Sequence, residues 1–171
     1  MASWSIAPYA DADRDAAAAF ILGVQAGEFG LPITLADQPD LLDVPGFYLR
    51  GALGPGGFWV ARDAAGAVAG TVALLNIGQG QAALRKMFVA PAARGAGLAA
   101  ALLDELLAFC VRAGITAVYL GTTDRYLAAH RFYAKRGFAR LEKRELPAAF
   151  PFMAVDTLFF VRRVPLQKRQ A

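Results

Sequence analysis

Apolar residues recur along the 171-residue chain with two periods, and each period predicts one kind of element. Short apolar or alternating runs bounded by glycine or proline indicate strands. These strands are expected at 4–9, 57–62, 67–75, 82–90, 117–122, 138–146 and 155–164. Apolar positions three or four residues apart indicate helices, which are expected at about 12–28, 98–110 and 125–136. The segment 31–50 has no long period and is expected to hold one or two short helical turns.

The order of these elements predicts an α/β (α+β) fold with a mixed, mostly antiparallel central sheet. The turn at 63–66 is typical of a hairpin and joins two of the antiparallel strands. The strands at 82–90 and 117–122 are joined through a helix, so we expect them to be parallel. The last two strands are expected to pair antiparallel around a loop at 147–151. The length favours one domain over residues 1–171.

A glycine-rich turn, Arg94-Gly95-Ala96-Gly97-Leu98-Ala99, separates the strand at 82–90 from the helix at 98–110. Free backbone N–H groups and the helix dipole favour an anion there, and glycines let a ligand approach the backbone closely. We therefore expect a phosphate-bearing ligand. The turn fits both the dinucleotide fingerprint G-x-G-x-x-G/A and the pyrophosphate pattern R/Q-x-x-G-x-G/A, and a turn without a ligand stays open. A dinucleotide fold needs several parallel units, and antiparallel strands before the turn count against it.

Composition narrows the function classes further. The single cysteine, Cys110, lies on the apolar side of a helix, and one cysteine with one histidine is too few for an ordinary zinc site, so no metal is expected. No apolar run reaches the ~18 residues of a membrane span, and no signal peptide is visible. We expect a cytoplasmic protein with no membrane partner. The net charge is +4, without a nucleic-acid-binding motif, so no nucleic acid is expected. The basic residues gather at Arg131, Lys135, Arg136, Arg140, Lys143 and Arg144, and at Arg162, Arg163, Lys168 and Arg169.

Two blocks together resemble the GNAT superfamily of N-acetyltransferases. The first runs from Leu84 through Pro91 into the turn Arg94–Ala99. The second, Ala128–Phe138, is similar to the family's A-x-x-F-Y-x-K-x-G-F helix-to-strand signature. The blocks stand in the family's order, with a helix and a strand between them, and the resemblance is close over about 56–140.

The resemblance implies a sheet that splays between its two parallel strands, helices on both faces, and acetyl-CoA in the opening. The cofactor half would span about 82–140. Strand backbone would bind the pantetheine arm, the glycine turn would hold the pyrophosphate, and an aromatic ring would pack beside the coenzyme. The coenzyme residues are then Met87, Phe88, Val89, Arg94, Gly95, Ala96, Gly97, Leu98, Ala99 and Phe132.

Tyr133 matches the family's usual general acid, which protonates the departing thiolate. The chain departs from the family at Tyr126, because many members carry a coenzyme-binding asparagine seven residues before that tyrosine. The asparagine's role is therefore not transferred to Tyr126, and Asp124 and His130 are the nearby polar candidates.

The implied reaction is acetyl transfer to a primary amine by direct attack in a ternary complex. The acceptor would be a small molecule or a peptide, and the protein a monomer or homodimer. The segment 28–50 would form the acceptor wall, with Glu28, Asp37 and Asp40 as substrate-binding residues that favour a cationic amine. The general base is not readable from sequence, and these three acids and Asp156 are its candidates. A non-catalytic acyl-CoA sensor of the same fold, or a dinucleotide-dependent oxidoreductase, are the alternative functions.

Overall fold

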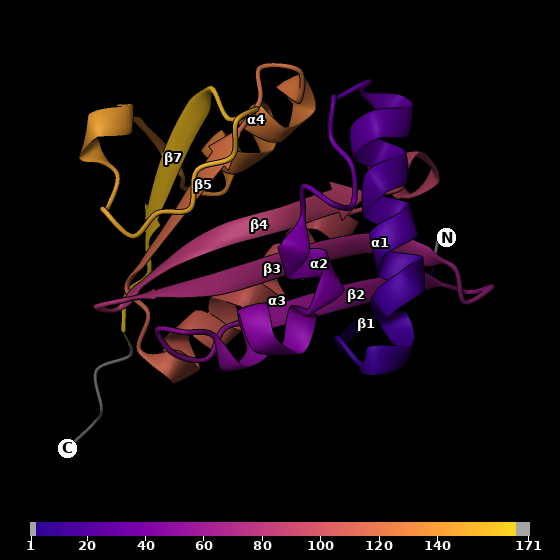
Figure 1. The fold of residues 1–171 in the computed structure, drawn as a ribbon, viewed down its shortest axis with the longest axis horizontal. Helices are drawn as coiled ribbons and strands as arrows, with labels where there is room; N and C mark the ends of the chain where they lie inside the picture. Colours follow the sequence, from indigo (N-terminus) through magenta and orange to yellow (C-terminus); the bar gives the residue numbers. More distant parts are fainter. Residues whose placement is uncertain (1–2, 167–171) are drawn as a thin grey trace.

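A seven-stranded sheet organises the chain, with helices packed on both of its faces (Figure 1). The computed structural model describes residues 3–166, so Lys168 and Arg169 of the second basic cluster lie outside it. The strands are β1 (Trp4–Pro8), β2 (Gly57–Asp63), β3 (Val68–Gly78), β4 (Gln81–Val89), β5 (Ala117–Thr122), β6 (Ala139–Leu141) and β7 (Leu158–Arg163). The α-helices are α1 (Arg14–Leu22), α2 (Pro39–Leu42), α3 (Leu98–Ala113) and α4 (Leu127–Lys135). The tighter or wider helical turns are η1 (Asp11–Asp13), η2 (Gly23–Glu28), η3 (Pro45–Arg50), η4 (Pro91–Ala93) and η5 (Lys143–Glu145).

The strand order is β1-β2-β3-β4-β5-β7-β6, and every neighbouring pair is antiparallel except β4 and β5. This topology confirms the predicted mixed, mostly antiparallel sheet with one parallel pair. It has only one parallel crossover, so the repeated parallel units of a dinucleotide-binding fold are not present in residues 3–166.

The parallel pair holds together over only three residue pairs. Gln81, Ala82 and Ala83 of β4 face Ala117, Val118 and Tyr119 of β5, and no pairing continues beyond them. Strand β4 nevertheless runs on to Val89 and β5 to Thr122, so the two strands diverge (Figure 1). One edge of β4 from residue 84 onward therefore lacks a strand partner. This confirms the expected splay.

A β-bulge marks the same stretch of β4. Pairing with β3 jumps between Thr71 and Ala73, and Lys86 has the positive φ of 54°. The side-chain hydroxyl of Thr71 donates a 2.7 Å hydrogen bond to the Lys86 carbonyl, which satisfies a group that the ladder leaves free. The bulge thus changes the direction of β4 where the sheet opens.

The Lys86 side chain is buried on the α1–α2 side of the sheet and is held by polar groups of that layer. Its Nζ atom lies 3.3 Å from the Asp40 carboxylate and donates a hydrogen bond to the Gln38 amide oxygen. Asp40 also accepts a 2.5 Å bond from the Tyr48 hydroxyl. Gln38 and Gln25 exchange reciprocal amide bonds of 2.9 and 3.1 Å. Burial lowers the pKa of Lys86 to about 8, and the Asp40 charge opposes this fall.

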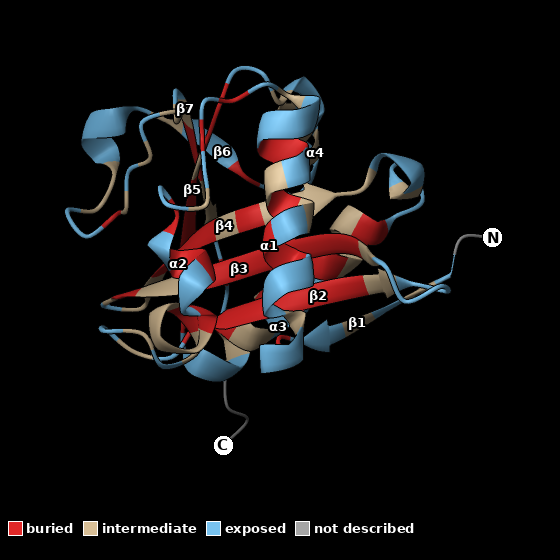
Figure 2. Cartoon of the chain, turned by 45° about the vertical axis from the view of Figure 1, so that its right-hand side comes forward, coloured by how far each residue is buried: buried red, intermediate tan, exposed pale blue. Residues whose placement is uncertain are grey.

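The central strands are mostly buried (Figure 2), and hydrophobic clusters pack against the sheet. Leu98, Leu102 and Leu106 of α3 are fully buried against it, as their helical spacing predicts. At Gly70 of β3 a Cβ atom would lie only 2.9 Å from a Leu102 methyl group. Glycine at this position therefore lets α3 approach the sheet closely. On the opposite face, α1, α2 and η3 pack around the fully buried Tyr48.

The last two strands are shorter than the sequence pattern predicts. Instead of 138–146 and 155–164, they span Ala139–Leu141 and Leu158–Arg163, although they do pair antiparallel. The chain after β6 turns through η5 and then follows the face of the sheet, where Phe150 packs against Ile77 and Tyr119. Phe150 thus lies in the loop expected at 147–151, whereas Leu146, which the pattern assigns to a strand, also lies in a loop and packs against the same cluster. Strand β7 lies between β5 and β6, which places this loop beside the splay.

The buried ion pair gives a stability prediction. Asp40→Leu leaves the Lys86 ammonium buried without its anionic partner, so the free energy of unfolding should fall by about 3–5 kcal/mol. Adding Lys86→Met to that variant removes the stranded charge and should restore part of the loss. Urea denaturation measures both variants, with Asp104→Asn on the exposed side of α3 as a control that keeps the wild-type midpoint. A double variant no more stable than the single one would contradict the argument.

Candidate functional site

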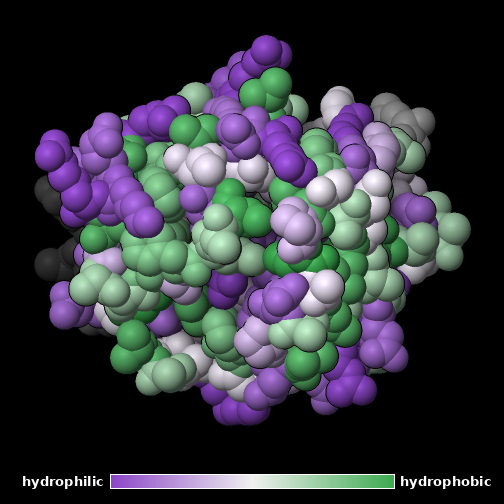
Figure 3. Space-filling view, turned by 45° about the horizontal axis from the view of Figure 1, so that its top comes forward, coloured by the Kyte–Doolittle hydropathy of each residue, from purple (hydrophilic) through white to green (hydrophobic). Residues whose placement is uncertain are grey.

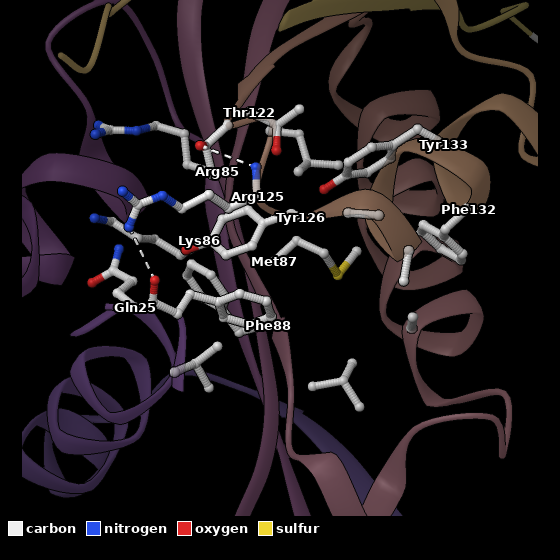
Figure 4. A pocket seen from close by; sticks show the side chains of 18 of the residues that line it. Gln25, Arg85, Lys86, Met87, Phe88, Thr122, Arg125, Tyr126, Phe132 and Tyr133 are labelled. Carbon is white, nitrogen blue, oxygen red and sulfur yellow. Dashed lines mark hydrogen bonds between the residues drawn. The ribbon is translucent and has the colours of Figure 1, made fainter. Parts of the chain in front are cut away.

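A cavity of about 670 Å³ occupies the opening between β4 and β5 (Figure 4). Its walls come from η2 and the residues just after it, β4, the glycine turn, the start of α3, the end of β5, α4 and the loop at 150–156. On the face seen in Figure 3, hydrophobic residues are exposed among hydrophilic ones. The sequence-predicted coenzyme residues that line the cavity are Met87, Phe88, Val89, Arg94, Gly95, Gly97, Leu98, Ala99 and Phe132. Ala96 lies in the same turn but is not one of the lining residues.

Strand β4 presents backbone to this cavity. Beyond Ala83 it has no partner on the β5 side, so N–H and C=O groups along residues 84–89 lack ladder bonds at that edge. Unpaired strand edges bind extended chains by adding a strand. A chain of amides such as a pantetheine arm matches this edge.

The glycine turn forms one end of the cavity. Gly95 and Gly97 adopt positive φ angles of 77° and 88°, and the space above each is open. Gly97 is the N-cap of the 16-residue helix α3, so the unpaired N–H groups of the first helical turn and the positive end of the dipole lie here. The turn has the geometry of an anion site, as its sequence predicts.

The Arg94 side chain is bound to Glu28, the last residue of η2. Both of its terminal nitrogens contact the Glu28 carboxylate, one at 2.7 Å, and its Nε atom donates to the Val89 carbonyl at 3.1 Å. The hydrogen bonds from Arg94 hold the pKa of Glu28 below its ordinary value. Glu28 was expected in the acceptor wall. It instead connects the end of η2 to the glycine turn, and it does not line the cavity.

Helix α4 places Tyr133 and Phe132 on the opposite wall (Figure 4). The ring of Tyr133 is buried among Phe132, Phe138 and Phe160, which fixes its orientation. Burial raises the pKa of the Tyr133 hydroxyl, and the neighbouring Tyr126 adds to the rise. Tyr133 therefore keeps its proton at neutral pH and can act as a hydrogen-bond donor.

Tyr126 lies near the middle of the cavity (Figure 4). Its ring packs edge-on against Phe29, with the centroids 4.7 Å apart, and its hydroxyl is buried with no hydrogen-bond partner in residues 3–166. Burial raises the pKa of Tyr126 to about 12. A buried donor without a protein partner points to a ligand or water. The other two polar candidates lie outside the lining: Asp124 is exposed, and the His130 ring contacts the Thr123 carbonyl at 2.9 Å.

The other two acids expected in the acceptor wall, Asp37 and Asp40, lie at a second, smaller cavity of about 350 Å³. Asp37 is exposed and accepts bonds from the backbone and side chain of Thr34, which lower its pKa. Asp40 is buried and is already paired with Lys86 and Tyr48. The acids of the 28–50 segment therefore have protein partners, and they do not give the main cavity a surplus of negative charge. Their role in binding substrate stays a prediction.

Asp156 is the candidate base that lines the main cavity. It is half-buried, and burial raises its pKa despite a 3.3 Å hydrogen bond from the Met153 N–H and the charges of Arg85 and Lys86. A Cβ atom at Gly121 would lie 2.5 Å from its carboxylate oxygen, so only glycine admits this placement at the end of β5. A carboxylate with a raised pKa suits proton transfer near neutral pH.

Sequence reasoning missed two arginines that line the cavity, Arg85 of β4 and Arg125 before α4. Arg125 donates to the Phe29 and Gly30 carbonyls at 3.1 Å. Arg85 lies over the Phe47 ring, 5.6 Å from its centroid. For Arg85 the signal was present in the sequence. Arg85 and Lys86 are adjacent charges in a strand expected to be buried, and buried charges need partners or a function.

Cys110 is remote from this chemistry. Cys110 lies on the side of α3 that faces the core and is fully buried, and burial raises the pKa of its thiol to about 12. Within residues 3–166 there is no group of three or more His, Cys, Asp or Glu side chains that could hold a metal ion. In the same residues, no helix is long and apolar enough to cross a membrane.

Comparison with known proteins agrees with this geometry. The crystal structure of an acetyltransferase of the GNAT family from Staphylococcus aureus superposes with a TM-score of 0.91 and 32% identity, covering 95% of this chain and all of that one. An uncharacterized N-acetyltransferase of Schizosaccharomyces pombe is 32% identical over 117 residues, which are 67% of this chain and 70% of the relative.

Human N-acetylaspartate synthetase is 33% identical over 137 residues, or 77% of this chain. The match spans only 44% of that relative's length. A scan for known families matches residues 31–138 to the acetyltransferase (GNAT) family. Since this match covers more than half of the sequence and includes the splayed strands and the glycine turn, the chain belongs to the GNAT acetyltransferase family.

Proposed function

We propose that the protein transfers an acetyl group from acetyl-CoA to a primary amine by direct attack. The splay of β4 and β5 is the observation that carries this proposal. It leaves a strand edge for the pantetheine arm that leads to an anion site at the start of α3, so one extended ligand with a pyrophosphate fits both ends. Phe132 would pack beside the coenzyme.

The transfer forms a bond between the amine nitrogen and the acetyl carbon and breaks the bond from that carbon to sulfur. A backbone N–H on the free edge of β4 would stabilise the developing oxyanion. The ammonium proton passes to Asp156, the carboxylate in the cavity wall, before attack. The Tyr133 hydroxyl donates its proton to the departing thiolate, and the tyrosinate then takes up the second proton, which the amine nitrogen loses as the amide forms. An acyl-enzyme step through the one cysteine is disfavoured, since Cys110 is fully buried.

The relatives bear on the acceptor. The N-acetylaspartate synthetases are named for a product that is an N-acetylated amino acid, and those of Danio rerio and Homo sapiens match 62% and 77% of this chain. We propose a small-molecule amine as the acceptor on this basis. Thiol release from acetyl-CoA, measured against a panel of amines, tests the function. Acetyl-CoA binding without thiol release for any amine would favour the alternative of an acyl-CoA sensor.

The glycine turn gives the first prediction of this function. Acetyl-CoA should raise the melting temperature of the wild-type protein, and Gly97→Glu should abolish the shift, because a carboxylate then occupies the phosphate site. Gly66→Glu in the β2–β3 turn is a matched control. Gly66 has a similar φ of 84° and equally open space, but it lies outside the cavity. Equal thermal shifts in both variants would refute the phosphate assignment.

The second prediction concerns the acid. Tyr133→Phe should lower kcat by about 10²–10⁴-fold, the usual contribution of a general acid, while acetyl-CoA affinity stays close to wild type because the ring is retained. The loss should shrink with an acyl donor whose thiol is more acidic. Steady-state kinetics with the two donors measure this. Near-normal kcat with chemistry rate-limiting would exclude the hydroxyl as the acid.

The third prediction concerns the base. Because burial raises the pKa of Asp156, its reactive carboxylate form is lost as the pH falls through a value above the ordinary aspartate range. The kcat–pH profile should therefore fall on the acid side with an apparent pKa above that range. Asp156→Asn should lower kcat and remove this limb, whereas Asp37→Asn should keep it. An unchanged acid limb in Asp156→Asn would assign the titration to another group.

A further inference from the structure

We propose that the acceptor amine also carries a carboxylate, as a free amino acid does, and that Arg85 binds this carboxylate. The inference rests on the proposed function and goes beyond it by naming the substrate class and a specificity-determining residue. It starts from the position of Arg85, which lines both the coenzyme cavity and the smaller cavity beside it. Met153 and Val155 also line both cavities, so the side chain lies at their junction.

Arg85 is half-buried, yet within residues 3–166 no carboxylate lies within 4.0 Å of its guanidinium. The two acids that line the smaller cavity are engaged elsewhere. Asp40 is paired with Lys86 and Tyr48, and Asp37 with Thr34. A guanidinium taken partly out of water without an anionic partner is costly. An anion that arrives with the substrate would supply that partner.

The balance of charge in the main cavity points the same way. Among the cations that line it, Arg94 is neutralised by Glu28 and Lys86 by Asp40. Asp156 is the one carboxylate of the lining in the described residues, and it is the group assigned to the ammonium. Arg85, Arg125 and Arg136 are the lining cations with no carboxylate within 4.0 Å in the described residues, and of these Arg125 and Arg136 are exposed whereas Arg85 is half-buried. Arg85 lies on the side of the cavity away from Phe132 and Tyr133 (Figure 4).

The planar shape of the Arg85 guanidinium would make it selective for a carboxylate. A planar guanidinium binds a carboxylate through two parallel hydrogen bonds, which a neutral amide or a bare alkyl group cannot reproduce. With Asp156 taking the ammonium and Arg85 the carboxylate, a zwitterion would be held at two points. The carboxyl-free analogue of the same amine would leave Arg85 unpaired.

The experiment compares acceptors that differ only in the carboxylate. Alanine is measured against ethylamine and alaninamide, and phenylalanine against 2-phenylethylamine and phenylalaninamide, by thiol release from acetyl-CoA. The amino acid should have the higher kcat/KM by roughly 10- to 100-fold, the range for a charged hydrogen bond. Arg85→Gln should remove this advantage by lowering kcat/KM for the amino acid alone.

Two further variants separate recognition from structure. Arg85→Lys should retain part of the preference, since it keeps the charge but loses the two-pronged geometry. Arg112→Gln, at the exposed end of α3, should retain all of it. An equal loss for amino acids and plain amines in Arg85→Gln, or a wild-type preference for the plain amines, would overturn the proposal.

Binding without turnover separates this inference from the proposed function. Calorimetry with alanine or phenylalanine, in the presence of coenzyme A, should show binding to the wild type that Arg85→Gln weakens by a similar factor. Carboxylate-dependent binding without thiol release would contradict the proposed transferase function and support the carboxylate site at Arg85. Thiol release that does not depend on the carboxylate, with no carboxylate-dependent binding in calorimetry, would support the transferase function and contradict the carboxylate site.

Discussion

The bulge at Lys86, fixed by a buried ion pair, is the constraint on which the site depends. Where the sheet opens, β4 must leave β5 on one edge while it remains paired with β3 on the other. A bulge accommodates that change of direction. Here the bulged residue is Lys86, whose ammonium group contacts Asp40 of α2. The 28–50 segment and β4 are therefore joined through the buried contacts of Lys86 with Asp40 and Gln38. Displacing either one would shift the backbone groups that face the cavity.

Most of the fold could be predicted from the sequence because local patterns determine it. The leucine spacing of α3, the glycine turn before it and the parallel crossover to β5 each follow from short-range chemistry. The C-terminal strands were predicted too long, because an apolar residue such as Leu146 can pack a loop onto the sheet as well as it can extend a strand. Hydrophobic periodicity records burial, and it does not record which backbone carries the buried residue.

The site was predictable where a backbone motif defines it and not where side chains meet across the fold. The turn from Arg94 to Ala99 could be predicted as an anion site because its glycines and the start of a helix leave backbone N–H groups free. The partners of Glu28 and Asp40 are 66 and 46 residues away from them, at Arg94 and Lys86, so no local pattern could show that these acids are already paired. The lining cations of the main cavity that lack a carboxylate partner, such as Arg85, become visible only once these pairs are known.

The single thiol of the chain has a consequence for how the molecule can be studied. Cys110 faces the core from α3 and has no exposed surface, so a thiol reagent can reach it only when that helix opens. In the folded state, a reagent that detects released coenzyme would leave the protein unlabelled. The slow modification of Cys110 would in turn report how often the α3 layer separates from the sheet, and a bound ligand that holds the start of α3 should slow that labelling.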